Sequence, residues 1–158
     1  MKKKKDNTTK KVIIASAIAF VALVLLVAYQ TEQANKKLEE SGVTTMLARA
    51  SFIDSSTRGN SVIVIGMESC PYCQQALPVM AEAAKQTNTT IHYIDLDNVD
   101  SETRDYVASQ VSEQVGGGWG VPLTLAFSNG EVVDQLSGLA DLDTYIQFFG
   151  NYAEEAQE

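Results

Sequence analysis

The chain has 158 residues, of which 45% are apolar, so it is long enough for one ordinary domain with a packed core plus an appendage. Its formal net charge of −8 is unevenly divided: residues 1–11 hold six Lys and one Asp, whereas residues 31–158 hold six Lys or Arg and nineteen Asp or Glu. This acidic body argues against binding to nucleic acid or to anionic lipid, since both require a cationic surface.

An uncharged apolar run, residues 12–29, follows the basic segment 1–11. As a helix it would be about 27 Å long, close to the ~30 Å of a bilayer's hydrocarbon core, and it has no polar face. We therefore predict a single transmembrane signal anchor with the lysines in the cytoplasm and the rest of the chain outside. A cleaved signal peptide is the alternative, and it also leaves the body outside the cytoplasm. Lipoprotein processing is excluded because no cysteine follows the run closely.

The remaining chain is predicted to contain a polar stalk over residues 30–42, a domain over residues 43–152 and an acidic tail over residues 153–158. Amphipathic spacing predicts four helices, at residues 43–56, from the two cysteines to about Lys85, at 100–114 and at 140–152. Short apolar, β-branched runs predict four strands, at residues 61–67, 90–97, 123–128 and 131–136.

Local signals mark several boundaries of these elements. Asp100 and Asp141 stand where helix N-caps are expected, and Asn129-Gly130 is typical of a type I′ hairpin turn. The order of elements predicts a parallel β-α-β unit followed by an antiparallel hairpin. We therefore expect an α/β domain with a mixed sheet and helices on both faces.

The only two cysteines, Cys70 and Cys73, lie in the stretch ESCPYCQQALPVM. A structural zinc site requires four ligands, and besides the two cysteines the chain has only one histidine, His92, so we expect no metal. A purely structural disulfide is possible outside the cell, but it would close a minimal loop and stabilise little. A redox-active dithiol is the interpretation that we favour over these two.

The predicted strand and helix on either side of the cysteines favour this interpretation. Cys70 would lie at a helix N-terminus, where unpaired N–H groups and the helix dipole lower the pKa of a thiol. Pro71 at the first helical position loses no hydrogen bond. Cys73 would lie one turn deeper, remain a thiol, and then resolve the mixed disulfide. The carboxylate of Glu68 would oppose the thiolate of Cys70 in part, unless it is simply a solvated loop residue.

At this point the chain resembles the thioredoxin-like superfamily, and its CPYC motif resembles that of glutaredoxins. The resemblance covers about residues 43–152, and the three prolines stand where this superfamily has them: Pro71, Pro78 and Pro122. It implies that Pro78 kinks the helix and that Pro122 follows a cis peptide bond and faces the dithiol. The backbone of Val121 would then pair with an incoming peptide strand beside Cys70.

The resemblance also implies which residues take part in exchange. Cys70 and Cys73 would alternate between a dithiol and a disulfide, without a metal or an organic cofactor. The residues expected to contact the substrate are Val121, Trp119, Pro71 and Tyr72. Trp119, in the glycine-rich loop 115–120, would offer an apolar platform to an unfolded substrate; the alternative is that it packs on the body of the domain.

Departures from the superfamily are informative. Ser69 replaces the tryptophan that precedes the first cysteine in thioredoxins, and Val64 and Tyr93 replace a buried Asp and a Lys. The usual proton acceptor for Cys73 is thus missing, and water or Glu68 would have to serve. No cation precedes CPYC, which argues against specificity for glutathione. The narrower resemblance is to small membrane-tethered thioredoxin-like proteins, including the bacteriocin transport accessory group.

These features predict a membrane-anchored, extracytoplasmic thiol-disulfide oxidoreductase. Its partners would be exported, unfolded or cysteine-containing proteins or peptides, and a membrane or extracytoplasmic redox partner that recycles the cysteine pair. The alternatives are a reductase fed by a membrane electron carrier and a non-catalytic accessory or chaperone module of an export system.

Overall fold

The computed structural model describes residues 3–40, 42–46 and 48–152. The predicted acidic tail, residues 153–158, lies outside the described residues, as do the first two residues of the basic segment. The chain forms two compact units, Met1–Lys37 and Leu38–Glu158, and each is described by itself.

The first unit consists of most of one long helix, α1 (Lys3–Glu40), which also includes much of the predicted stalk. Within it, Ile13–Gln30 has a mean hydropathy of 2.4, and none of this segment is buried. The segment is long and apolar enough to cross a membrane.

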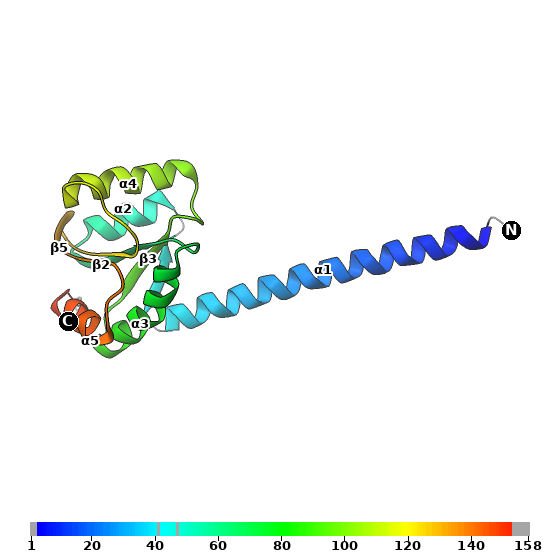
Figure 1. The fold of residues 1–158 in the computed structure, drawn as a ribbon, viewed down its shortest axis with the longest axis horizontal. Coiled ribbons are helices and arrows are strands. Elements are labelled where there is room, and N and C mark those ends of the chain that lie inside the picture. Colours follow the sequence, from blue (N-terminus) through cyan, green and yellow to red (C-terminus); the bar gives the residue numbers. More distant parts are fainter. Residues whose placement is uncertain (1–2, 41, 47, 153–158) are drawn as a thin grey trace. The chain divides into compact units, whose positions relative to one another are not determined.

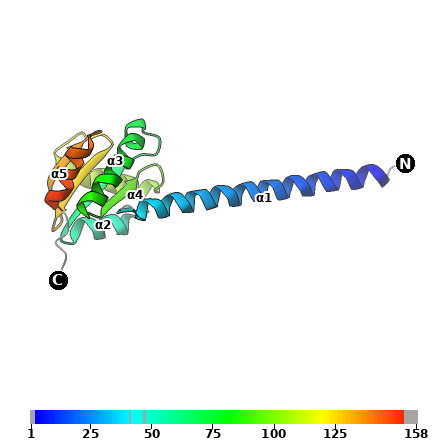
Figure 2. The same cartoon turned by 90° about the horizontal axis from the view of Figure 1, so that it is seen from below.

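In its described residues, the second unit is a five-stranded sheet with two helices on each face (Figures 1 and 2). The strand order is β1-β3-β2-β4-β5, in which β1, β3 and β2 are parallel and β4 and β5 are antiparallel to their neighbours. The strands are β1 (Val43–Met46), β2 (Asn60–Gly66), β3 (Ile91–Asp95), β4 (Leu123–Ser128) and β5 (Glu131–Ser137). The helices are α2 (Arg49–Thr57), α3 (Pro71–Thr87), α4 (Ser101–Val115) and α5 (Leu142–Tyr152). The predicted mixed α/β architecture is confirmed.

One predicted element is wrong. The sequence predicts a single helix over residues 43–56, but these residues form strand β1 and the separate helix α2. Val43 and Met46 are buried at the two ends of β1, and the strand pairs in parallel with β3. The helical spacing of apolar residues in this stretch therefore arises from two different elements, and pairing with a distant strand overrides it.

The local boundary signals are confirmed by hydrogen bonds and dihedral angles. The Asp100 carboxylate accepts from the Thr103 N–H at 2.8 Å, and the Asp141 carboxylate accepts from the Thr144 N–H at 2.9 Å. Asn129 and Gly130 have φ angles of 51° and 94°, as a type I′ turn requires. These caps and this turn fix where α4, β5 and α5 begin.

Two cores lie on opposite faces of the sheet, because side chains alternate between faces along each strand. One core packs α3 and α5 against the sheet and contains Val62, Val64, Ile91, Tyr93 and Phe149. The other packs α2 and α4 against the sheet and contains Phe52, Ile63, Ile94, Val107 and Phe127. Both faces of β2 are therefore covered, as its apolar sequence predicted.

One buried polar group, Thr124 in β4, lacks a hydrogen bond in the described part of the chain. Its residue is fully buried, and its Oγ1 has no partner there. Thr124 is opposite Val64 in the antiparallel ladder, so its side chain lies on the face that α3 and α5 cover. A buried hydroxyl without a partner lowers the stability of the fold.

We expect Thr124→Val to stabilise the protein by about 1 kcal/mol, because valine replaces the unpaired hydroxyl with a methyl group of similar volume. Urea unfolding of the full-length chain in detergent measures the change. Thr90→Val, at an exposed threonine, is the matched control and should have little effect. A loss of stability in Thr124→Val would show that the hydroxyl is satisfied in solution.

Candidate active site

The cysteine pair lies where strand β2 turns into helix α3. β2 ends at Gly66, and α3 begins at Pro71, so Cys70 is the N-cap residue. Cys70 is half-buried, whereas Cys73 is only 3% exposed. Both are free thiols, which is the reduced form of the predicted couple. The turn from β2 into α3 thus places the accessible Cys70 sulfur and the buried Cys73 sulfur at the same, N-terminal end of the helix.

The start of α3 favours a thiolate on Cys70. The Cys73 N–H, the Cys73 thiol and, more weakly, the Tyr72 N–H all favour negative charge on the Cys70 sulfur, so the pKa of Cys70 falls below its ordinary value. Partial burial and the negative charge of Asp97 act in the opposite direction. The predicted direction of the pKa shift is confirmed, and its cause is the one expected, unpaired N–H groups of the first helical turn.

Cys73 has the opposite character. Burial, the largest cause, raises the pKa of Cys73 to about 11, and the nearby Met67 N–H offsets this only in part. The neighbouring Cys70 and the charge of Asp95 raise the pKa further. When the pair loses its first proton, the negative charge therefore resides on Cys70, while Cys73 keeps its proton.

The loop before β4 completes the site. The Val121–Pro122 peptide bond is cis, as the resemblance implied. The Cys70 thiol lies 3.7 Å from the Val121 carbonyl oxygen, to which it donates a weak hydrogen bond. Pro122 is buried, and its carbonyl oxygen accepts from the Gly138 N–H at 2.8 Å. Cys70, Val121 and Pro122, which lie far apart in the sequence, therefore meet.

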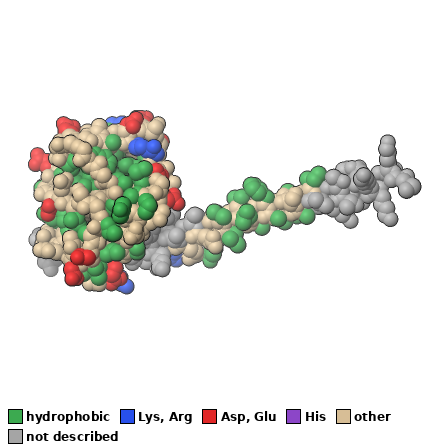
Figure 3. Space-filling view, in the orientation of Figure 1, with side chains coloured by type: hydrophobic (Ala, Val, Ile, Leu, Met, Phe, Trp, Pro, Cys, Tyr) green, Lys and Arg blue, Asp and Glu red, His purple; other side chains and the backbone are tan. Residues whose placement is uncertain are grey.

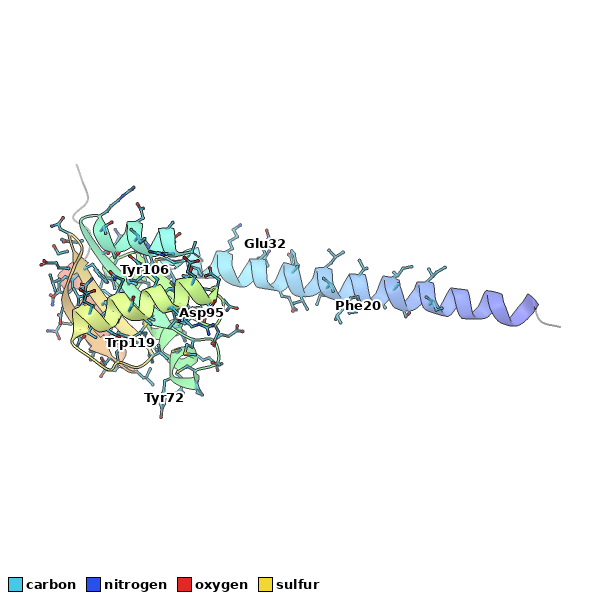
Figure 4. All side chains as sticks on the ribbon, turned by 90° about the horizontal axis from the view of Figure 1, so that it is seen from above. Phe20, Glu32, Tyr72, Asp95, Tyr106 and Trp119 are labelled. Carbon is cyan, nitrogen blue, oxygen red and sulfur yellow. The ribbon has the colours of Figure 1, made fainter. Side chains whose placement is uncertain are left out.

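The other residues predicted to contact a substrate differ in their exposure to solvent. Tyr72 is 60% exposed at the outer end of α3, next to the exposed Pro71 (Figure 4). Trp119 is half-buried, and its Nε1–H donates to the Ser112 hydroxyl of α4 at 3.0 Å. It packs against the core between α2, α4 and the sheet. Tyr72 thus presents a free aromatic surface, whereas Trp119 is anchored to the body of the domain.

Two apolar residues next to the cysteine pair are not fully covered. Val121, whose carbonyl oxygen lies beside the Cys70 sulfur, and Met67, whose carbonyl oxygen accepts from the Cys70 N–H, are both half-buried. Figure 3 shows apolar side chains gathered on the face of the domain that this view presents, with most acidic side chains toward its edges.

Sequence reasoning missed the segment after β3, which supports the loop of the cysteines. The Asp95 carboxylate accepts from the Glu68 N–H at 3.1 Å, and the Asp97 carboxylate accepts from the Ser69 N–H at 2.8 Å. The side chain of Asn98 donates to the Glu68 carboxylate at 3.1 Å. The available signal was the sequence IDLDN, because the carboxyl ends of adjacent parallel strands meet at one edge of a sheet.

The sequence leaves two roles open for Glu68, a partial opposition to the Cys70 thiolate and a solvated loop carboxylate. In the structure Glu68 is exposed and its carboxylate accepts a hydrogen bond from the Asn98 side chain, which favours the solvated loop residue. The carboxylate whose charge raises the pKa of Cys70 is that of Asp97. In the described part of the chain, no group of three or more His, Cys, Asp or Glu residues could hold a metal ion.

No protein-family model matches the chain, and no curated protein sequence matches it. Many solved structures are similar. A mutant thioredoxin from Halobacterium salinarum has 25% identity and a TM-score of 0.55, with 71% of this chain and 91% of that chain covered. Thioredoxin from Plasmodium falciparum has 22% identity and a TM-score of 0.53, with 70% and 99% covered. Thioredoxin from Aeropyrum pernix has 18% identity and a TM-score of 0.54, with 65% and 81% covered.

The domain has a thioredoxin-like fold. Cys70 and Cys73 have the spacing of a CXXC motif. Together, the thioredoxin-like fold and the CXXC pair indicate the chemistry of a thiol-disulfide oxidoreductase, without indicating its substrate or direction.

The two thiols should differ in reactivity. We expect Cys70 to react with iodoacetamide with a midpoint pH below the ~8.5 of free cysteine, and Cys73 to remain unmodified in the folded protein. Asp97→Asn should lower the Cys70 midpoint further, because it removes a negative charge but keeps an acceptor for the Ser69 N–H. Mass spectrometry of the alkylated peptides measures both effects.

Glu113→Gln is the matched control for this charge change, since Glu113 is an exposed carboxylate of α4. It should leave the midpoint of Cys70 unchanged. A Cys70 midpoint at or above that of free cysteine would contradict the stabilisation of its thiolate by the start of α3.

Proposed function

We propose that this chain is a membrane-anchored thiol-disulfide oxidoreductase that forms or exchanges disulfides in exported proteins or peptides outside the cytoplasm. The observation that carries the proposal is the asymmetry of the cysteine pair. Cys70 is accessible and its pKa is lowered, whereas Cys73 is buried and its pKa is raised. This is the division that exchange through a mixed disulfide requires.

In the oxidising direction, the pair begins as a Cys70–Cys73 disulfide. A substrate thiolate attacks the accessible Cys70 sulfur, the Cys70–Cys73 bond breaks, and Cys73 leaves with the electron pair and takes up a proton. A second substrate thiolate then attacks the substrate sulfur of the mixed disulfide, and Cys70 leaves as its stabilised thiolate. The substrate has gained a disulfide, and the pair is left as a dithiol.

The segment around Val121 supports binding of an extended substrate. Its carbonyl oxygen lies next to the Cys70 sulfur, and its N–H makes no hydrogen bond within the described part of the chain. A substrate strand that pairs with these two groups would bring its cysteine beside Cys70. Pro71, Tyr72 and Trp119 would then contact its side chains, and Pro122 would form the floor beneath it.

The location rests on the N-terminal segment. The apolar helix Ile13–Gln30 is preceded by six lysines, and this asymmetry favours a cytoplasmic N-terminus. The thioredoxin-like domain would then lie where disulfides persist, and a membrane or extracytoplasmic partner would recycle it. The narrower assignment to the bacteriocin transport accessory type belongs to this proposal and rests on the sequence resemblance alone.

The Cys73→Ala variant should trap substrates. Because Cys70 can still form a mixed disulfide but no resolving thiol remains, we expect covalent adducts with exported proteins on non-reducing gels of cells that express the variant. Cys70→Ala is the matched control, which should form few or no adducts because Cys73 is buried. If Cys73→Ala forms no adducts and Cys70→Ala retains full activity in cells, the chain acts as a non-catalytic accessory instead.

The reduction potential of the pair decides the direction of exchange. Potentials of CXXC proteins run from about −270 mV for thioredoxin to about −120 mV for the strongest oxidases, and we expect an intermediate value. Equilibration of the full-length chain in detergent with glutathione buffers measures it. A value at the thioredoxin end would contradict the oxidising direction and favour a reductase fed by a membrane electron carrier.

A further inference from the structure

Cys73 must lose its proton before it can attack a mixed disulfide, and it must regain one when it leaves. It is only 3% exposed, so bulk water has poor access to its sulfur. Val64, in the strand that leads to the cysteines, is apolar and fully buried, so it cannot accept the proton. The exchange proposed above therefore needs another route for this proton.

The position of Tyr93 provides the first part of such a route. Its ring lies across Gly66, so closely that a Cβ atom at Gly66 would touch the hydroxyl and lie 2.7 Å from Cε2 and 2.8 Å from Cζ. The N–H of the next residue, Met67, lies near enough to the Cys73 sulfur to oppose in part the rise in the pKa of that thiol. The Tyr93 hydroxyl and the Cys73 sulfur therefore lie against consecutive residues of one backbone segment.

The Tyr93 hydroxyl is also available for proton transfer. The residue is only 8% exposed, and its hydroxyl lies against the backbone of Gly66. Burial raises the pKa of Tyr93, and the nearby charges of Asp95 and the cysteine pair raise it further, so the hydroxyl stays neutral. A neutral hydroxyl both donates and accepts, and it can therefore pass a proton along without becoming charged.

Asp95 provides the second part of the route. It lies two residues after Tyr93 in β3, on the same face of the sheet, and its charge raises the pKa of both Tyr93 and Cys73. Its Oδ1 accepts from the backbone N–H groups of Glu68 and Asp97, and its Oδ2 accepts from the side chain of Asn98 at 2.9 Å. Asn98 is exposed, so this carboxylate connects the interior to solvent.

We propose that Tyr93 relays the proton of Cys73 to and from Asp95. When Cys73 attacks the mixed disulfide, its S–H bond breaks and the proton passes, directly or through one bridging water, to the Tyr93 oxygen, while the Tyr93 O–H proton passes in the same way to the Asp95 carboxylate. The Cys73 sulfur bonds to the Cys70 sulfur, and the substrate sulfur leaves with the electron pair. In the oxidising direction the same steps run backwards, and Cys73 recovers its proton as it leaves Cys70. The relay rests on the exchange chemistry proposed above.

Several ionisable groups around the pair will shape the pH dependence of this step. Besides Tyr93, they come from the loop before α3, from α3 itself, from β3 and the segment that follows it, and from α5. They are Glu68, Cys70, Cys73, Asp95, Asp97 and Tyr145.

The test measures the reaction rates of the two cysteines separately. The reduced full-length chain, in detergent, is mixed in a stopped-flow instrument with an aromatic disulfide reagent. The first equivalent of coloured thiolate reports attack by Cys70, and the second reports attack by Cys73. We expect Tyr93→Phe to slow the second phase on the order of 10-fold to 100-fold near neutral pH and to leave the first phase unchanged. The deficit should shrink as pH rises, because hydroxide then removes the proton directly.

Tyr145→Phe is the matched control. Tyr145 is also buried and also senses the charge of Cys73, but its hydroxyl already donates to the Gly138 carbonyl and accepts from the Ala140 N–H. Its second phase should stay within about twofold of the native rate. Asp95→Asn should slow the second phase as Tyr93→Phe does, and the double variant should be no slower than the slower single variant, since both interrupt one route.

If the second phase of Tyr93→Phe has the same rate and the same pH profile as that of the native chain, the relay is overturned and the proposed oxidoreductase stands. A native chain without any second phase would instead overturn the oxidoreductase itself. If Tyr93→Phe fails to fold, the rate of the native second phase in mixtures of H₂O and D₂O decides. A curved dependence on deuterium content indicates that more than one proton moves, as the relay requires, and a linear one overturns the relay.

Discussion

The attraction between the first-turn N–H groups of α3, that of Cys73 above all, and the Cys70 sulfur is the interaction on which the chemistry of this domain depends. It exists because α3 begins at Pro71, immediately after the cysteine that caps it, so the first unpaired N–H groups of the helix point at that sulfur. A helix that began one residue later would lose this alignment. The asymmetry between the two thiols is thus set by where a single helix begins.

The sheet holds that helix start in place. β2 lies between β3 and β4, so its carboxyl end at Gly66 is paired on the side of β3, while β4 begins at Leu123 opposite Ile65. The antiparallel register of β4 is what carries the segment before it, with Val121, to the Cys70 sulfur. One strand therefore positions Cys70, and its two neighbours supply the supporting loop and the Val121 backbone beside the Cys70 sulfur.

Features that neighbouring residues encode could be predicted from the sequence. The buried strand β2, the N-cap at Asp100, the turn at Asn129-Gly130 and the lowered pKa of Cys70 all depend mainly on residues close in the chain. The strand β1 was misassigned because its stability comes from pairing with β3, 48 residues away from Val43 to Ile91 in the register.

The network after β3 was missed for the same physical reason. Asp95 and Asp97 hold backbone N–H groups of Glu68 and Ser69, which lie 27 and 28 residues away. Nothing near either carboxylate in the sequence specifies that contact. Gly66 is a second example. A glycine is needed there because the Tyr93 ring lies across it, and that contact is not visible in the sequence around position 66.

The placement of the acidic group follows from the cost of burying charge. A carboxylate at the position of Val64 would lie in the middle strand of the core, where an ionised group without partners is strongly destabilised. At the end of β3, Asp95 meets two backbone N–H groups and one amide side chain, so its charge is compensated by hydrogen bonds. Tyr93, two residues earlier on the same face of β3, places its neutral hydroxyl against Gly66, the residue that pairs with Asp95. The end of the sheet next to the cysteines therefore holds an ionisable group at its rim without placing a charge in the core.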